Sequence, residues 1–521
     1  MNGIRHRFRP SCRPQGLRQA HDREVIKARN QRDRRDDQTQ DWYSVHRMPQ
    51  DTADLIIWDS TPAGLTAAIA AVRAGVSVII VTEDQHVGGL QTSGLGMTNA
   101  GQKPTIGGIT REFHRRVLRH YVETFGRDSQ QVRDCEDGYR FEPHVAEMIW
   151  EMWLGETGVT CARRQVIESV DKSGAQLKAL RTTSGRRFAG KVFIDASYEG
   201  DLLALAGCSY HLGREANDVY GEPLASVGDA KLQPFDYRCC LTNVADNRVP
   251  FAEPAAYDPA NYAWFAWKMK QVDADRLIQA LPLNKLPNGK TDSRTAEWPG
   301  RSWGYIEATR AERAAIDRAH RQYSAGYLWH VMTDAAVPPT IRNEAARWGL
   351  AADEFGDNDH WPWRIYVREG RRLIGEYVTT QRDCEADRFK ADGVGVCSWF
   401  MDVHPLELIA ADDGFEEVGL INEPVRPFEL PWRSVLPRAT EAENLLVPVA
   451  LSASHVAFSA IRVEPVWMIL GESCGVGAAM SVEAAKAVHD VNVDELRDTL
   501  RGQGQVIDAK PFGDYWPHPP R

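Results

Sequence analysis

Residues 54–81, DLIIWDSTPAGLTAAIAAVRAGVSVIIV, decide the fold of this chain. The apolar run 54–58 predicts a buried parallel strand, the Ala-rich run 65–74 predicts a helix that ends at Gly75, and 76–81 predicts a second strand. A β-turn-α-β unit of this size is typical of dinucleotide-binding domains, whose turn presents backbone N–H groups to a pyrophosphate. The sequence therefore predicts an α/β protein that binds a dinucleotide.

The turn after the first strand departs from the glycine pattern G-x-G-x-x-G. Asp59 and Thr61 stand at the first two glycine positions, and only the third, Gly64, remains. A carboxylate beside a pyrophosphate is repulsive, by about 1 kcal/mol for a close charge pair in water and by more when buried. The residue that binds the adenosine ribose should close the second strand, where counting gives Thr82, with Glu83 one place later.

A second glycine-rich loop follows, QHVGGLQTSGLG at residues 85–96. Its glycines let the backbone approach a bulky ligand closely. The loop contains the complete pattern H-x-G-G-x-x-T-x-G-L-G, and with the preceding unit it resembles the FAD-dependent oxidoreductase family. That family shares the two-dinucleotide-binding-domain fold of fumarate reductase and glutathione reductase, and some of its members are labelled xanthan lyase.

The resemblance covers residues 52–490 and includes the segments 106–113, 141–147, 191–201, 213–217, 366–372 and 444–465. It implies non-covalently bound FAD. The residues that it places against FAD are Ser60, Thr61, Pro62, Ala63, Gly64, Thr82, Glu83, Gly88, Gly89, Leu90, Thr92, Ser93, Gly94, Val166, Asp195, Ala196, Ser452, Glu464 and Pro465.

The positions of these segments predict a discontinuous Rossmann-like FAD-binding domain, formed by residues 52–205 and 430–490. An α+β substrate domain, residues 206–429, is inserted between the two parts, and residues 491–521 form a C-terminal tail. We expect a helix over residues 464–488 whose N-terminus points at the flavin, where its partial positive charge favours an anionic reduced ring.

Residues 1–51 form a basic N-terminal segment without apolar periodicity, which we expect to be disordered. By our count residues 1–48 hold twelve Lys/Arg and six Asp/Glu, so they carry +6 of a total net charge of −10. A basic arm that binds nucleic acid and an over-extended gene start with Met48 as the initiator are the alternatives.

The remaining composition excludes several classes of protein. An acidic chain is a poor general nucleic-acid binder, because phosphate contacts supply most of that affinity. Charged residues interrupt every apolar stretch of 18 residues, so we expect no membrane span. The nine scattered cysteines include no C-x-x-C pair and fit a reducing, cytoplasmic location, and neither metal-ligand spacing nor a G-x-S-x-G elbow occurs.

Oxidation of a C–H bond by a flavin needs a base for the substrate proton and cations that fix the substrate. His455, which precedes the predicted C-terminal helix, is the first candidate base. Asp402-Val-His404 supplies the second, because alternation along a strand puts the carboxylate and the imidazole on one face. Arg433 and Arg462 are candidates for binding a carboxylate, a phosphate or the flavin charge.

The resulting hypothesis is an FAD-dependent oxidoreductase that transfers a hydride between FAD and a small polar substrate. A sugar derivative or a hydroxy acid is the substrate class we expect, and the electron acceptor stays unassigned. One alternative is a carbohydrate lyase or other non-redox enzyme with structural FAD. The other is a cofactor-free binding protein, which Asp59 motivates.

Overall fold

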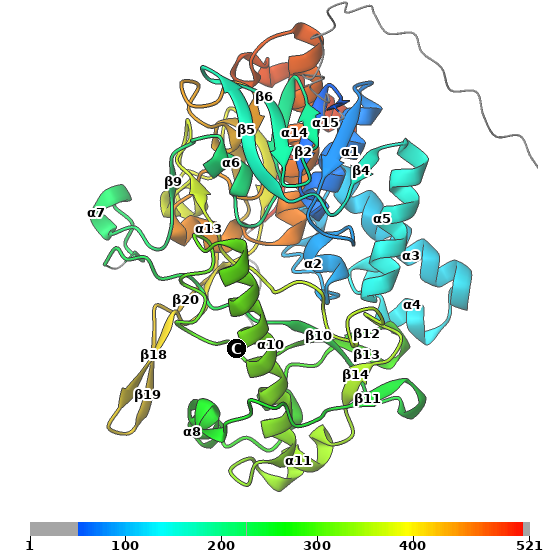
Figure 1. Ribbon diagram of the computed structural model, residues 1–521, viewed down its shortest axis with the longest axis vertical. Coiled ribbons are helices and arrows are strands. Elements are labelled where there is room, and N and C mark those ends of the chain that lie inside the picture. The colour runs from blue at the N-terminus through cyan, green and yellow to red at the C-terminus, as the bar shows by residue number, and fades with distance from the viewer. Residues whose placement is uncertain (1–49, 226, 514–521) are drawn as a thin grey trace, which may run out of the picture. The chain divides into compact units, whose positions relative to one another are not determined.

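Five parallel strands form the central sheet of the computed structural model, which describes residues 50–225 and 227–513 (Figure 1). The basic segment expected at residues 1–51 lies almost entirely outside the described residues. The strand order is β22 (Leu445–Leu446), β8 (Val192–Asp195), β2 (Leu55–Trp58), β3 (Val78–Val81) and β4 (Thr160–Ala162). The fold class is therefore α/β with a Rossmann-like sheet, as the sequence predicted.

The register of this sheet aligns the ends of its three middle strands. Trp58, the last residue of β2, pairs with Val81 on one side and with Asp195 on the other. The chain runs from β2 to β3 on one side and returns later to β8 on the other. Ligands of open parallel sheets bind at such a switch point, beyond the carboxyl ends of the strands.

Helix α1 (Pro62–Arg73) follows β2 directly and packs against α14 (Glu464–Ala484). Glycines make this approach possible, because a Cβ at Gly471 would lie 2.2 Å from the Ala63 carbonyl oxygen and one at Gly475 would lie 2.3 Å from that of Ala67. Gly471 and Gly475 therefore allow α14 to pack closely on α1. Helix α14 ends four residues earlier than the expected 464–488.

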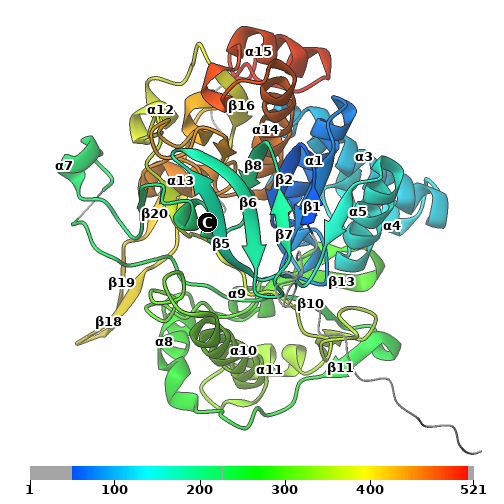
Figure 2. The same ribbon diagram turned by 45° about the horizontal axis from the view of Figure 1, so that its top comes forward.

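Two further sheets accompany the central one (Figures 1 and 2). The first contains, in order, β1 (Gln50–Thr52), β7 (Arg187–Ala189), β6 (Gln176–Thr182) and β5 (Ile167–Ser173). The second is antiparallel and contains β11 (Arg248–Pro250), β14 (Gly349–Ala351), β10 (Arg238–Thr242), β13 (Lys290–Arg294) and β12 (Asn284–Leu286). This antiparallel sheet lies entirely within the segment predicted to be inserted.

Four pairs of short strands complete the sheets. They are β9 (Tyr210–His211) with β15 (Arg372–Leu373), β16 (Gly393–Cys397) with β21 (Phe428–Pro431), β17 (Met401–Val403) with β20 (Ile421–Glu423), and β18 (Glu407–Ala411) with β19 (Gly414–Val418). The β18–β19 hairpin extends from the rest of the fold in Figure 1.

The other α-helices are α2 (Gly89–Thr92), α3 (Gly108–Phe125), α4 (Gln130–Asp134), α5 (Pro143–Thr157), α6 (Asp201–Leu205), α7 (Asn217–Tyr220), α8 (Ala263–Gln271), α9 (Leu277–Ala280), α10 (Arg310–Thr333), α11 (Pro339–Ala345), α12 (Gln381–Glu385), α13 (His455–Ile461) and α15 (Val493–Gly502). Helices α8, α10 and α11 gather with the antiparallel sheet at one end of Figures 1 and 2, away from β2 and α14. The described residues form a single compact unit, so the expected borders at 205 and 430 remain predictions.

Two features of the C-terminal part differ from simple expectations. The expected tail at 491–521 includes α15, which buries Leu496 and Leu500. Among the described helices, α14 is the one long and apolar enough to cross a membrane by length and composition, and 89% of its most apolar 18-residue window is buried inside the fold. Its apolar character is that of a core helix.

Candidate active site

The turn after β2 keeps a glycine-like backbone although Asp59 replaces the glycine. Asp59 has φ = +76°, in the left-handed region that favours glycine. Its carboxylate accepts hydrogen bonds from the backbone N–H of Ser60 at 2.8 Å and from the hydroxyl of Thr82 at 3.0 Å. The turn is therefore built from the ends of β2 and β3 together, and the contact of Thr82 with a ribose remains a prediction.

The start of α1 shows why Gly64 is retained. A Cβ at Gly64 would lie 2.3 Å from the carbonyl oxygen of Asp59 and 3.2 Å from Cβ of Ala196. Thr61 caps the helix, since its hydroxyl oxygen accepts the N–H of Gly64 at 3.3 Å and its hydroxyl donates to the Ala196 carbonyl at 2.7 Å. The N-terminus of α1 therefore packs against the residues that follow β2 and β8.

An arginine from the inserted segment reaches this turn. The Arg364 guanidinium donates to Asp59 and to Asp84, both at 2.9 Å, and lies 3.4 Å from Glu199. Burial raises the pKa of Asp84 to about 6, although Arg364 acts to lower it. One cation therefore compensates a group of carboxylates at the carboxyl ends of the strands.

This group lines a cavity of about 220 Å³ beside the ends of β2 and β3. Glu83 lies at the same cavity and forms an ion pair with Arg310, while Arg313 pairs with Asp201 at 2.7 Å. The position beyond β2 and β3 is the one where the sequence placed the adenosine end of a dinucleotide.

The second glycine-rich loop meets the N-terminus of α14 around one tyrosine. A Cβ at Gly89, where φ is +52°, would lie 2.5 Å from the Tyr198 hydroxyl oxygen and 3.2 Å from Pro62. The Tyr198 hydroxyl accepts the N–H of Leu90 at 3.0 Å and donates to the carboxyl group of Glu464. Four segments distant in sequence therefore converge here.

A small cavity of about 10 Å³ lies at this N-terminus. It is lined by Leu90, Gln91, Leu95, Thr98, Asn99, Tyr366, Arg462, Val463, Glu464 and Trp467. Four buried polar atoms of these side chains have no hydrogen-bond partner among the described residues: Thr98 Oγ1, Arg462 Nε, Glu464 Oε2 and Trp467 Nε1. Burial raises the pKa of Glu464 to about 8, so its carboxyl group is a hydrogen-bond donor at neutral pH.

Unpaired buried polar atoms are rare in folded proteins, and four of them at one cavity point to a polar ligand. The mixture of donors and acceptors fits the edge of a flavin ring, which carries both. A ligand cavity usually has a volume of about 300–1,000 Å³. Side chains at this cavity must therefore move when a ring binds, and an adjoining cavity of about 320 Å³ shares Thr98 and Asn99 with it.

Asp402 lies in β17 and His404 is the first residue after this strand, and the two side chains lie close together, as the sequence predicted. His404 Nε2 lies 3.4 Å from Asp402 Oδ2, and His404 Nδ1 lies 2.5 Å from Glu297 Oε1. Arg462, which lines the small cavity, places Nη2 3.1 Å from Asp402 Oδ2. Burial acts to raise the pKa of Asp402, but His404 and Arg462 hold it well below its usual range.

The chain matches the family model described as FAD dependent oxidoreductase over residues 54–500. This chain belongs to the FAD-dependent oxidoreductase family. FAD is accordingly its cofactor, and the glycine cradle at Gly64 and Gly89 and the unpaired polar atoms near Glu464 fit that group.

Comparison with curated proteins finds no match. Solved structures of flavoproteins are similar over part of this oxidoreductase. L-amino acid deaminase from Proteus vulgaris is 12% identical, with a TM-score of 0.25, and the match covers 37% of this chain and 55% of that one. OxyS anhydrotetracycline hydroxylase from Streptomyces rimosus is 12% identical, with a TM-score of 0.24 and 39% of each chain covered.

A third match, 3-ketosteroid-delta4-(5alpha)-dehydrogenase from Rhodococcus jostii RHA1, is 11% identical with a TM-score of 0.20. It covers 31% of this oxidoreductase and 49% of that chain. The matched region thus spans about half the length of that dehydrogenase. These similarities are too partial to bear on the substrate.

His455, the first candidate base of the oxidoreductase, is almost completely buried at the start of α13. Its Nδ1 lies 2.9 Å from Glu369 Oε1, and its Nε2 has no partner among the described residues. Gln233 connects it to the other histidine, because it donates to Glu369 at 3.2 Å and accepts the N–H of His404 at 3.2 Å. The two candidate bases therefore belong to one buried polar network.

Arg433 does not join this network, contrary to its selection as a candidate. Its side chain is 51% exposed, and its Nε lies 2.8 Å from Asp392 Oδ2. The 3-10 turn in which it sits directs it away from the small cavity, whose lining does not include it. Among the candidate arginines, Arg462 alone lines that cavity.

Other cofactor candidates shape the site through the backbone. Asp195 is fully buried, and its carboxylate accepts the N–H of Ser197 at 3.0 Å and that of Leu203 at 2.8 Å. Ser452 Oγ accepts the N–H of Gly375 at 3.0 Å, and the Val166 carbonyl accepts the N–H of Thr183 at 2.9 Å. Their contacts with FAD remain predictions.

The loop positions among the cofactor candidates adopt the conformations that their residue types favour. Gly88 and Gly94 have φ of +97° and +102°, and a Cβ at Gly94 would lie 1.6 Å from the Arg238 carbonyl oxygen. The Thr92 hydroxyl donates to the Val87 carbonyl at 2.7 Å, and Ser93 Oγ accepts the N–H of Arg364 at 2.9 Å. The loop is therefore tied to the segment that carries Arg364.

Sequence reasoning missed several residues of the site, namely Thr98, Tyr198, Glu297, Arg364 and Trp467. Arg364 lies two residues before a segment that resembles the family, which is the only sequence signal near it. Glu297 follows β13, far from His404 in sequence, and only the packing of the inserted sheet brings the two together.

One group of potential metal ligands lies outside the site. Glu142, His144 and Glu354 offer ligand atoms within 4.8 Å of one another. The buried Lys290 ammonium lies 2.8 Å from Glu142 and 2.7 Å from Glu354. A lysine already supplies the positive charge between these carboxylates, so we assign no metal to them.

Proposed function

We propose that this oxidoreductase oxidises a small hydroxylated substrate, a hydroxy acid or a sugar derivative, with His404 as the base. The observation that carries the proposal is the chain of contacts from the small cavity to the imidazole. Arg462 lines that cavity and holds Asp402, and Asp402 faces His404 Nε2. His455 has no such link to the cavity through a charged side chain among the described residues.

FAD supplies the hydride acceptor in such a reaction. Glu297 Oε1 lies 2.5 Å from His404 Nδ1 and favours a hydrogen on that atom. In the neutral imidazole that acts as the base, Nε2 is then the nitrogen that accepts a proton. We expect Nε2 to take the proton of the substrate hydroxyl, while the C–H hydrogen leaves with both bonding electrons. Asp402 and Glu297 then stabilise the imidazolium that forms.

Arginines near the imidazole support a substrate with an anionic or strongly polar group. Arg294 Nη1 lies 3.0 Å from Glu297 Oε1, and its side chain is 36% exposed. Arg368 is buried and lies 3.0 Å from both Asp236 and Glu297. Arg294 is thus the more accessible cation, and we expect it to meet the polar group of the substrate.

The test is anaerobic reduction of the FAD-loaded protein by a panel of hydroxy acids and sugar derivatives. The loss of flavin absorbance measures the rate of reduction. We expect at least one compound to bleach the flavin. His404→Gln should slow bleaching by about 10²–10⁴-fold, the usual contribution of a general base, with FAD still bound. His489→Gln is the matched control, because His489 donates to the Pro437 carbonyl at 2.8 Å and lies outside the network.

Three other results would redirect the assignment. Normal bleaching in His404→Gln with none in His455→Ala would move the base to His455. Product formation without any bleaching or electron acceptor would favour a lyase with structural FAD. A colourless protein that cannot be reconstituted with FAD would favour the binding-protein alternative.

A further inference from the structure

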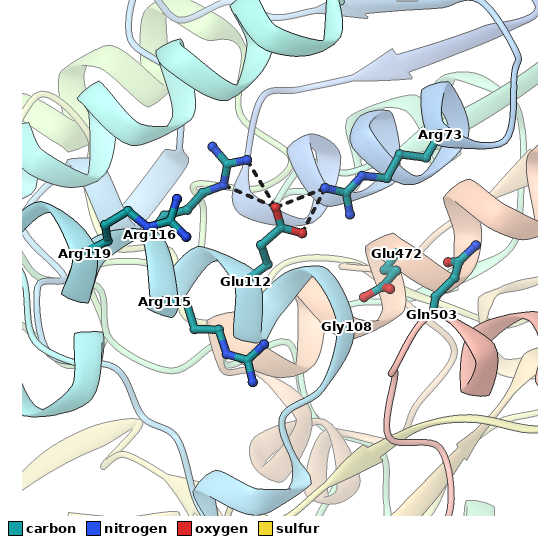
Figure 3. Close-up of a pocket in the computed structure, with 8 residues that line it drawn as sticks. All are labelled: Arg73, Gly108, Glu112, Arg115, Arg116, Arg119, Glu472 and Gln503. Atoms are coloured by element: carbon teal, nitrogen blue, oxygen red, sulfur yellow. Dashed lines mark hydrogen bonds and ion pairs between the residues drawn. The ribbon is translucent and has the colours of Figure 1, made fainter.

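A cavity of about 540 Å³ lies on the side of α14 that faces α3 (Figure 3). It is lined by Arg73, Gly108, Glu112, Arg115, Arg116, Arg119, Glu472 and Gln503. Most of these residues lie on one face of α3, at the helical spacing 108, 112, 115, 116 and 119. The volume is within the range typical of small-molecule sites.

The arginines of this cavity are unequally paired. Glu112 holds two of them, with Arg73 Nη2 at 2.9 Å and Arg116 Nη2 at 3.1 Å, and Arg116 also reaches Glu156 at 2.8 Å. The side chains of Arg115 and Arg119 have neither an ion pair nor a hydrogen bond with any residue of 50–225 or 227–513. Figure 3 shows both of them without dashed lines, on the same stretch of α3.

Two unpaired arginines four residues apart on a helix repel each other. Such like-charge pairs destabilise a helix by about 0.2–0.5 kcal/mol. An anion between or beside the guanidinium groups removes that repulsion, and Arg is suited to bind phosphate or carboxylate through two parallel hydrogen bonds. The charge arrangement therefore favours an anionic ligand.

Glu472 is a second, independent sign of a ligand. Its side chain is fully buried, and its Oε2 accepts the N–H of Ile109 at 2.9 Å and the side-chain amide of Gln505 at 2.6 Å. Its Oε1 is buried and has no partner among the described residues. Burial raises the pKa of Glu472 to about 7, so its protonated form is available to donate a hydrogen bond to an oxyanion.

The backbone is shaped around this carboxyl group. Gly108 has φ = +49°, and a Cβ there would lie 2.2 Å from Glu472 Oε2. Helix α3 can therefore begin against Glu472 only with a glycine at this position. Glu472 and Gly108 both line the cavity, so the unpartnered Oε1 belongs to a buried side chain at its edge.

We propose that this cavity is a second ligand site, which binds a small soluble oxyanion with at least two negative charges. Arg115 and Arg119 bind its phosphate or carboxylate groups, and Glu472 contacts one of its oxygens. The site is distinct from the flavin site, since Glu472 follows Glu464 by eight residues, about 12 Å along α14. The proposal goes beyond the proposed oxidation and does not depend on it.

Calorimetric titration of the FAD-loaded full-length protein with inorganic pyrophosphate tests the proposal. We expect saturable binding at one site, with the flavin absorbance unchanged because FAD is not displaced. Arg115→Gln/Arg119→Gln should weaken binding by at least about tenfold, since two charge-assisted contacts are lost. Arg111→Gln/Arg127→Gln is the matched control, because it also removes two positive charges. Arg111 lies in α3 and Arg127 two residues after its end, and neither lines the cavity.

A charge-conserving variant and a vesicle experiment complete the test. Arg115→Lys/Arg119→Lys keeps both charges and should bind more tightly than the double Gln variant, which separates lost charge from lost folding. Vesicles containing phosphatidic acid test a lipid headgroup as the source of the phosphate, and vesicle binding without pyrophosphate binding would overturn the soluble ligand. Absence of pyrophosphate binding, or equal weakening in the Arg111/Arg127 control, would overturn the site itself.

Discussion

Arg364 and Asp59 form an ion pair of 2.9 Å at the turn where dinucleotide-binding domains carry their first glycine. The arginine comes from a segment 305 residues further along the chain. It compensates the charge that made Asp59 an obstacle to pyrophosphate binding. The glycine-poor turn and the distant arginine therefore have to be considered together.

Substitution of Asp59 separates its charge from its backbone conformation. Asp59→Gly suits φ = +76° and frees Arg364 for a phosphate, so we expect tighter FAD binding. Asp59→Asn tolerates the same φ without the charge and should also tighten FAD, whereas Asp59→Ala should cost about 1 kcal/mol or more of stability. Flavin fluorescence titration measures affinity and urea unfolding measures stability; unchanged affinity in Asp59→Gly would mean that the carboxylate points away from FAD.

Removal of Arg364 should be severe. Arg364→Gln leaves Asp59, Asp84 and Glu199 without their shared cation, and breaking buried pairs of this kind costs about 3–5 kcal/mol. We expect lower stability, measured by urea unfolding, and weaker FAD binding, measured by flavin fluorescence titration. Asp59→Gly in the same chain should restore part of the loss, whereas Arg388→Gln, which removes an arginine bonded to the Pro427 carbonyl, should change little.

The spacing between α1 and α14 should tolerate no side chain at Gly471. The added methyl of Gly471→Ala would meet the Ala63 carbonyl oxygen at 2.2 Å, so the two helices must separate. We expect a loss of about 1–3 kcal/mol, as for other overpacked cores. We also expect weaker FAD binding, because Ala63 lies in the first turn of α1, the helix that the sequence predicts to face the pyrophosphate. Gly155→Ala in α5, where no atom lies within 4 Å of the new Cβ, should instead gain about 0.5–1 kcal/mol.

Glu472 should make stability depend on pH. Burial raises its pKa from 4.5 to about 7, while Glu112 acts to raise it further and Arg73 and the Ile109 N–H act to lower it. A raised pKa means that its contribution is fully present below pH 4.5 and is lost as the pH rises to about 7. Relative to Glu472→Gln, the wild type should lose up to about 1.4 kcal/mol of unfolding free energy per pH unit in that window.

Urea unfolding of both proteins between pH 4.5 and 8 measures this difference. Glu123, an exposed residue of α3, provides the control. The unfolding free energy of Glu123→Gln should change with pH as that of the wild type does. A difference between wild type and Glu472→Gln that stays constant with pH would contradict the raised pKa.

The sequence by itself determined the β2-α1-β3 unit, because apolar strands, an Ala-rich helix and Gly64 are local signals that packing did not override. It also predicted that the side chains of Asp402 and His404 lie close together, although β17 ends at Val403, one residue before His404. Their distance of 3.4 Å confirms that inference. Arg368, Arg371 and Arg372, in the segment 366–372 that resembles the family, lie outside any helix and are buried in ion pairs.

The tertiary structure alone decided which distant charges meet. Arg364 at Asp59, Glu297 at His404 and Glu472 at the start of α3 are each brought together by the packing of elements far apart in the chain. It also decided that Arg433 is half exposed while Arg462 lines the small cavity. No local sequence pattern predicts these contacts, because the partner of a buried charged side chain comes from a distant segment that only the complete fold brings near.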